Sequence, residues 1–201
     1  MNLTDQSTST VPDLLDPAFF AAAAAYVLLQ LAYSVRLKDV VILDIFVVAL
    51  GFVLRVVAGG LVIAVPISPW LLLCTMLLAL FLAMSKRRHE LLLLEGDAVR
   101  HRRSLGEYSF RLLDQMISVV TASTVIAYCL YTVSEETVRK FGTDRLIYTT
   151  PFVLYGIFRY LYLIHQKDQG GSPEELILKD KPLLLAIVFW IASIVTIIYF
   201  S

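Results

Sequence analysis

Basic and acidic side chains gather in one polar segment, residues 85–103, of an otherwise apolar chain. Lys86, Arg87 and Arg88 follow one another there, and Glu90 comes two residues later. Guanidinium groups pair with phosphate oxygens through parallel hydrogen bonds, and carboxylates help to hold magnesium ions that bridge phosphates. The segment continues with further groups of both kinds, namely Asp97, Arg100, His101, Arg102 and Arg103. This pattern predicts a polyphosphate site; the alternative is a basic anchor at the membrane surface.

Three ionisable side chains, Asp44, Arg55 and Arg159, interrupt apolar stretches that are long enough to cross a membrane. Such a group costs roughly 3 kcal/mol or more at the bilayer centre and by default indicates function. Asp44 and Arg55 share a helical face with Gly51, but they lie about 16 Å apart along the helix axis, so each needs another partner. The structural alternatives are a solvated helix-entry acid for Asp44 and snorkelling to the outer interface for Arg55.

Arg159 lies between two tyrosines on one helical face. Tyr155 precedes it by four residues, and Tyr162 follows it by three. This polar and aromatic strip favours a functional role, although an interface anchor of the aromatic-belt kind would look similar.

A second polar segment, residues 169–180, contains the start of a short helix. Ser172, Pro173 and Glu175 have the spacing of a capping box with proline at the first helical position. Because helix N-termini bind anions, Lys179 in the same segment also allows an anion site here. The two interpretations remain open at the level of sequence.

The composition requires a membrane setting for these groups. Of 201 residues, 58% are apolar and 17% are charged, and seventeen Lys and Arg balance seventeen Asp and Glu. Soluble domains carry about 25% charged residues. The zero net charge argues against nucleic-acid binding.

Apolar stretches of about 20 residues are long enough to cross a bilayer as helices. We predict an all-α fold: a polytopic membrane helical bundle of about six transmembrane helices, in a domain at 17–201 that follows a polar leader at 1–16. The predicted spans are 17–35, 40–64, 69–85, 114–133, 146–164 and 183–200.

Lysines and arginines are concentrated in the first, third and fifth loops, and the second loop has none. The positive-inside rule therefore predicts a multi-pass protein of the cell (inner) membrane whose active face is cytoplasmic.

Several motifs together resemble those of the UbiA-type intramembrane prenyltransferases. They resemble most the decaprenyl-phosphate phosphoribosyltransferase branch, found in bacteria that build arabinose-containing cell walls. The motifs are YSVRLK at 33–38, LD at 43–44, GFVLR at 51–55, FLAMSKRRHE at 81–90, TPFVLYGIFRY at 150–160 and SPEELILKD at 172–180.

The chain departs from that superfamily in one respect. Members have nine helices and an N-D-x-x-D-x-x-x-D motif near the second, whereas this sequence has six predicted helices and no such motif. We therefore expect the first three helices to be missing. The alternative to an active transferase is a truncated or split member, incomplete alone, to which a separate chain supplies those helices.

The resemblance implies transfer of 5-phosphoribosyl from phosphoribosyl pyrophosphate to a polyprenyl (decaprenyl) phosphate, with Mg²⁺ as cofactor. Lys86, Arg87 and Arg88 are assigned to the diphosphate and Glu90 to metal or ribose. The implied catalytic residues are Asp44, Glu90 and Arg159. The implied substrate-binding residues are Lys38, Arg55, Lys86, Arg87, Arg88, Tyr155, Tyr160, Glu174, Glu175 and Lys179. The other implied partners are membrane lipids. The sequence leaves open whether the chain forms a homo-oligomer.

Overall fold

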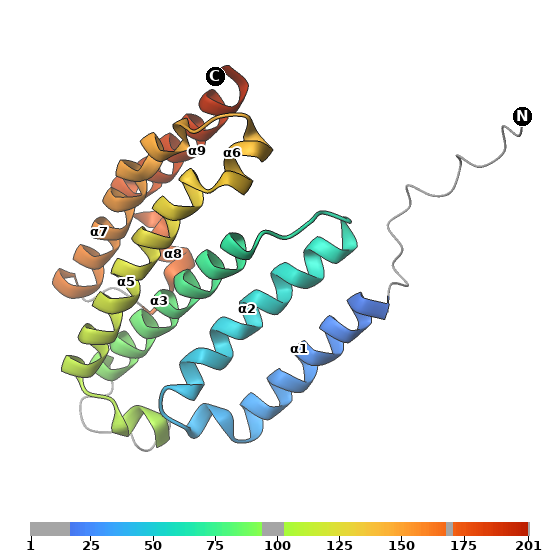
Figure 1. Ribbon diagram of the computed structural model, residues 1–201. Coiled ribbons are helices and arrows are strands. Elements are labelled where there is room, and N and C mark those ends of the chain that lie inside the picture. The colour runs from blue at the N-terminus through green and yellow to red at the C-terminus, as the bar shows by residue number, and fades with distance from the viewer. Residues whose placement is uncertain (1–16, 94–102, 168–170, 201) are drawn as a thin grey trace, which may run out of the picture.

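The computed structural model describes residues 17–93, 103–167 and 171–200, and the described residues contain helices and no strands (Figure 1). Six helices, one of them extended at its start by a 3₁₀ turn, are long and apolar enough to cross a membrane. They are α1 (Pro17–Val35), α2 (Leu43–Val62), α3 (Pro69–Leu93), α5 (Phe110–Val133), α7 (Thr150–Gln166) and α9 (Lys181–Phe200). The prediction of an all-α multi-pass membrane bundle is confirmed.

Shorter helical segments connect these spans. They are the α-helices α6 (Glu135–Phe141) and α8 (Pro173–Lys179) and the 3₁₀ turns η1 (Leu37–Asp39), η2 (Arg103–Glu107) and η3 (Arg145–Thr149). Serine caps fix two of the helix starts, because Ser109 accepts a hydrogen bond from the Leu112 amide and Ser134 accepts one from the Thr137 amide. Helix α6 ends at Gly142, whose φ of 72° is a conformation that glycine adopts at little cost.

The helices form a layer with α3 in the middle (Figure 1). Helix α3 packs against α2 on one side and α5 on the other, α1 covers α2, and α7 packs against α9. The fully buried side chains lie mostly toward one end of the bundle. They include Ile45 of α2, Met84 of α3, Leu113 and Ile117 of α5, and Ile164 of α7. Helix α1, in contrast, has no buried residue.

Helix α3 is longer than expected, and this changes the setting of the basic segment. The predicted span ended at residue 85, but the helix continues to Leu93, so Lys86, Arg87, Arg88 and Glu90 are helical rather than part of a loop. Lysine, arginine, glutamate and leucine are good helix formers. Because successive residues point about 100° apart, these side chains face different neighbours.

The starts of α2, α5, α7 and α9 also differ from the prediction by two to four residues, and those of α2 and α5 show why. Helix α2 begins at Leu43 instead of 40, after the turn η1 and Ile42, whose φ is 69°. Helix α5 begins at Phe110 instead of 114, because Ser109 caps it. In both cases local turn and cap chemistry set the boundary, which apolar content alone could not locate.

Candidate functional site

Except for Arg55, the charged side chains of the spans collect at one end of the bundle, in what we call the charged layer. It is formed where α1, α3 and α7 end and where α2, α5 and α9 begin, with α8 beside them. Its members are Tyr33, Asp44, Arg87, Arg88, Glu90, Tyr108, Asp114, Arg159, His165 and Asp180. Hydrogen bonds divide these residues into three clusters.

The first cluster is centred on Arg87, which is 5% exposed. Its Nε donates to Asp44 Oδ2 at 2.9 Å, its Nη1 donates to Glu90, and its Nη2 lies 3.3 Å from the Tyr33 hydroxyl. Asp44 is completely buried, and its second oxygen accepts a hydrogen bond of 2.7 Å from Tyr108. The expectation that Asp44 needs a partner other than Arg55 is confirmed.

Tyr108 completes this cluster from the turn before α5. Its hydroxyl donates to Asp44 and accepts a hydrogen bond of 2.7 Å from the Ile42 amide. Burial, together with the hydrogen bond to Asp44, raises the pKa of Tyr108 above its ordinary value. Tyr108 therefore remains a neutral donor. Tyr108 was not predicted as a site residue, because a single tyrosine near a helix start carries no distinctive pattern.

The second cluster ties α3, α5 and α7 together through Asp114. Arg88 Nε donates to Asp114 Oδ1 at 2.8 Å, and His165 Nε2 lies 3.2 Å from the same oxygen. Arg88 also donates to the Ile164 carbonyl at 2.9 Å. The basic residues of α3 thus point in different directions: Arg87 toward α2 and Arg88 toward α5 and α7.

The third cluster joins α7 to the start of α9. Arg159 donates to both carboxylate oxygens of Asp180, at 3.1 Å and 2.8 Å, and its guanidinium lies 5.0 Å from the centre of the Tyr162 ring. Asp180 also accepts from the Leu183 amide at 2.9 Å. The Arg159 guanidinium lowers the pKa of Asp180 below its ordinary range. Asp180 immediately precedes α9, and an aspartate at a helix start is a common N-cap. That position is the sequence signal that could have identified Asp180 as a site residue.

The segment before α9 differs from the predicted capping box. Proline does occupy the first turn of α8, but the Ser172 side chain makes no capping hydrogen bond. Glu175 pairs instead with Lys179 at 2.6 Å on the exposed side of α8, and Lys179 lowers the pKa of Glu175. The capping box is therefore wrong, because an i,i+4 ion pair engages the carboxylate that the cap requires.

Gly171 brings this segment close to α3. A Cβ atom at this position would lie 2.5 Å from His89 Cδ2, closer than a carbon atom can approach. The absence of a side chain lets the backbone pass over the imidazole ring, so the segment that leads into α8 lies against the basic part of α3.

The remaining predicted residues have separate positions. Lys86 is exposed, Tyr155 is exposed on α7, and the Lys38 backbone carbonyl accepts a hydrogen bond from Ser104 at 2.8 Å. The Glu174 side chain lies outside what the structure describes, as do Asp97, Arg100, His101, Arg102 and the Arg103 side chain.

Arg55 is distant from the charged layer. It lies near the middle of α2, where it donates to the Tyr26 hydroxyl of α1, and Gln30 donates to the same oxygen at 2.8 Å. The Arg55 guanidinium lies 5.0 Å from the centre of the Tyr26 ring and 5.1 Å from that of Phe52. Its partners are therefore neutral, unlike those of Arg87, Arg88 and Arg159.

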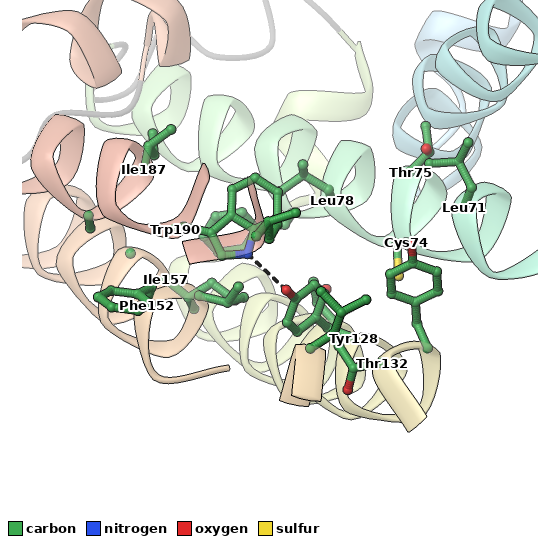
Figure 2. A pocket seen from close by; sticks show the side chains of 18 of the residues that line it. Leu71, Cys74, Thr75, Leu78, Tyr128, Thr132, Phe152, Ile157, Ile187 and Trp190 are labelled. Atoms are coloured by element: carbon green, nitrogen blue, oxygen red, sulfur yellow. Dashed lines mark hydrogen bonds between the residues drawn. The ribbon is translucent and has the colours of Figure 1, made fainter. Parts of the chain in front are cut away.

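An apolar cavity of about 610 Å³ lies next to the charged layer, between α3, α5, α7 and α9 (Figure 2). Tyr160 and Ile177 line it close to that layer, and Trp70 lines it near the opposite end of α3. Inside, Trp190 Nε1 donates to the Tyr128 hydroxyl at 2.8 Å, which fixes α9 against α5. Of the residues that line it, Tyr160 was predicted as a substrate contact; the others look like ordinary bundle core in the sequence.

The layer and the cavity together suit an amphipathic ligand. Charged groups at the end of the bundle can contact a polar head, while the cavity can take an apolar chain; ligand cavities commonly measure about 300–1,000 Å³. Among residues 17–93, 103–167 and 171–200, no three His, Cys, Asp or Glu side chains lie together as a metal site. The described residues thus do not form a protein cage for a divalent cation.

Comparison with known proteins gives several relatives that share one name. Decaprenyl-phosphate phosphoribosyltransferase of Mycolicibacterium smegmatis is 34% identical over 184 residues, which are 89% of this chain and 58% of that protein. The proteins of the same name from Corynebacterium glutamicum and Mycobacterium tuberculosis are 32% and 30% identical, over 90% of this chain and 54% and 59% of their own lengths. The chain thus spans somewhat more than half the length of these relatives. No protein-family model matches it.

Proposed function

Because the chain is a homologue of the decaprenyl-phosphate phosphoribosyltransferases, a UbiA-type branch of membrane enzymes, we propose that it takes part in the same class of transfer. A 5-phosphoribosyl group moves from phosphoribosyl pyrophosphate to a polyprenyl phosphate. The observation that supports this most strongly is the position of the charged layer next to the apolar cavity. Such an arrangement fits a substrate with a phosphate head and a long apolar chain.

The reaction needs a site that handles negative charge. An oxygen of the polyprenyl phosphate attacks the anomeric carbon of the ribose, the bond from that carbon to the diphosphate breaks, and pyrophosphate leaves with the electron pair. Cationic groups that are already in place stabilise the charge that develops on the leaving group. We propose that this happens at the cytoplasmic surface of the cell membrane, where the basic loops were predicted to lie.

The three basic residues of α3 have different roles in this proposal. The Lys86 side chain is exposed and has no ion pair with another described residue, so it is the cation we assign to the diphosphate. Arg87 already binds two carboxylates, and Arg88 binds Asp114. We therefore propose that Arg87 holds Glu90 in place, and that Arg88 fixes α3 beside α5.

Arg159 and Glu90 are the residues we assign to the ribose and phosphate groups. Arg159 is held by Asp180 and flanked by Tyr162, so its guanidinium is restrained in one orientation. Glu90 is partly exposed, with a side chain 29% accessible. Lys38, Tyr155, Tyr160, Glu174, Glu175 and Lys179 remain proposed contacts around them.

Magnesium remains a proposal with narrow support. The described residues form no cluster of three metal-binding side chains, and both oxygens of Asp44 are engaged by Arg87 and Tyr108. Magnesium in phosphate sites is often held by one or two carboxylates and the phosphates themselves. Glu90 is the side chain that fits this role.

The proposed transfer can be tested with the chain alone in lipid nanodiscs. Ribose-labelled phosphoribosyl pyrophosphate and decaprenyl phosphate are added, and lipid-extractable label is measured. We expect Glu90→Gln to lower the rate by about 100-fold or more, while Arg139→Gln, on α6 at the opposite end of the bundle, leaves it unchanged. Failure of the wild-type chain to bind decaprenyl phosphate would overturn the proposal.

A second candidate is a family member that is incomplete alone and needs a separate membrane chain. The observation that favours it is the exposure of α1, which has no buried residue although it is long enough to span the bilayer. The same assay separates the two candidates. Binding of decaprenyl phosphate without formation of a lipid-linked product would support the incomplete member, and turnover by the chain alone would reject it.

A further inference from the structure

The face formed by α1 and α2 contains a charged group in surroundings that do not neutralise it. We call this surface the α1–α2 face and define it by Tyr26, Gln30, Phe52 and Arg55. Arg55 is exposed, and its contacts among the described residues are the Tyr26 hydroxyl and the rings of Tyr26 and Phe52. None of these groups carries a negative charge.

The depth of this group in the membrane follows from the two helices. Tyr26 is nine residues from each end of α1, or about 13 Å from either end. Arg55 turns toward Tyr26 and contacts both its ring and its hydroxyl. A snorkelling arginine would extend toward the nearer end of its helix and the aqueous interface. The guanidinium thus lies beside the middle of α1, far from either end of that span, and the snorkelling interpretation does not describe it.

An exposed guanidinium at this depth has an unfavourable free energy of transfer from water. Charged residues near the centre of a spanning helix are rare, and they normally pair with one another or face a cavity. Hydrogen bonds and cation–π contacts to Tyr26 and Phe52 offset part of this cost. An opposite charge brought to the same depth would offset much more.

A carboxylate is the group that can reach this depth. Lipid and substrate phosphates remain near the interface, about 13 Å away along α1. A second copy of this chain does not fit, because the carboxylates of its described spans, Asp44, Glu90 and Asp114, all belong to the charged layer at one end. We propose that the α1–α2 face binds a partner transmembrane helix with an Asp or Glu near its midpoint.

The shape of the face is compatible with such a helix. Helix α1 packs on α2 and buries none of its residues, so its remaining surface is available to a neighbour. Gly51 of α2 faces the Tyr26 ring, and a Cβ there would make an ordinary van der Waals contact of 3.6 Å with it. Hydrogen bonds from Gln30 and Arg55 to the Tyr26 hydroxyl hold Tyr26 and Arg55 together on this face.

A designed helix can test the proposal without knowledge of the natural partner. The probe is a leucine–alanine transmembrane peptide of about 22 residues with one Asp at its centre. Its association with the labelled chain in phosphatidylcholine vesicles is measured by energy transfer. Matched peptides carry Asn or Leu at the centre, or Asp within one turn of an end. We expect the central Asp peptide to associate about tenfold more tightly than the Leu peptide.

Variants of the chain identify the binding group. Arg55→Gln should reduce association of the central Asp peptide to the level of the Leu peptide, whereas Arg139→Gln on α6 should not change it. If Arg55→Gln does not fold, Arg55→Lys is the alternative variant. It keeps the positive charge but loses the planar guanidinium group, so it should retain part of the binding of the central Asp peptide. Tyr26→Phe, which preserves the ring, should weaken association less than Arg55→Gln.

Four outcomes would overturn the proposal. The first is equal association of the Asp and Leu peptides, and the second is association that Arg55→Gln does not alter. The third is displacement of the Asp peptide by a few mole per cent of decaprenyl phosphate, which would assign Arg55 to the substrate. Energy transfer between two copies of the chain through this face would favour a homo-oligomer instead.

Discussion

Arg87 and Arg55 are both arginines inside apolar helices, but their guanidinium groups have opposite surroundings. Arg87 in the charged layer is 5% exposed and binds two carboxylates. Arg55 on the α1–α2 face is exposed and binds neutral groups. The first charge is compensated within the described part of the chain, and the second is not. The charge of Arg87, which is neutralised by carboxylates, holds the helices together. The charge of Arg55, which is not neutralised, is available to another molecule.

The largest expected effect is that of Arg87→Ala. It would leave Asp44 completely buried with one partner removed, and such loss costs about 3–5 kcal/mol. Thermal unfolding in detergent should show this loss. The double variant Arg87→Ala, Asp44→Asn should recover a substantial part of it, because the uncompensated charge is gone. Equal stability of the single and double variants would contradict the assigned ion pair.

Gly171→Ala should have the next largest effect. The added Cβ would lie 2.5 Å from the His89 ring, and overpacking of this kind costs about 1–3 kcal/mol. Gly59→Ala on α2 is the matched control, because nothing lies within 4 Å of its added Cβ. That change should stabilise the helix by up to about 1 kcal/mol. Equal unfolding temperatures for the two variants would mean that the charged layer is not tightly packed.

The ion pair of Asp180 with Arg159 should give a smaller effect that depends on pH. The pKa of Asp180 is lowered in the folded protein. Its contribution to stability is therefore complete well above the ordinary aspartate pKa of about 3.9, declines as the pH falls below it, and disappears below the lowered pKa.

Asp180→Asn is the control for this pH dependence. The stability difference between wild type and Asp180→Asn, measured by thermal unfolding, should narrow from pH 6 to pH 3. A difference that is constant over this range would show that Asp180 does not titrate with a lowered pKa.

Arg55→Met should have the smallest effect on the chain alone. It removes contacts to Tyr26 and Phe52 worth about 0.5–1 kcal/mol, while it also removes an exposed charge from the bilayer. We expect the unfolding temperature in nanodiscs to change little. A fall in unfolding temperature as large as that of Arg87→Ala would contradict this prediction. It would mean that Arg55, like Arg87, stabilises the fold of the chain.

Much of the fold could be predicted from the sequence. Six apolar runs separated by charged or turn-forming segments indicated six spans, and the length of each run matched the thickness of a bilayer. The main error was the end of α3, placed at residue 85 instead of Leu93. A run of charged residues was interpreted as a loop, although lysine and arginine continue a helix readily when packing provides partners for them.

The candidate site was only partly predictable. The sequence identified Asp44, Arg87 and Arg159 by their charge, and each of them does lie in the charged layer. Tyr108 and Asp180, which bind two of them, were missed. Partners that are 21 and 64 residues away in the sequence leave no periodic signal, so spacing alone could not connect them.

The sequence by itself determined that the chain crosses a membrane and that its charges lie mostly at one end of the bundle. Both follow from local composition, because a bilayer excludes charges wherever they occur. Only the tertiary structure decided which arginine is neutralised. Arg87 meets Asp44 because α3 packs against α2, whereas Arg55 meets Tyr26 because α1 covers α2 with a helix that carries no carboxylate. Charge is a property of one residue, but its compensation depends on which helices become neighbours.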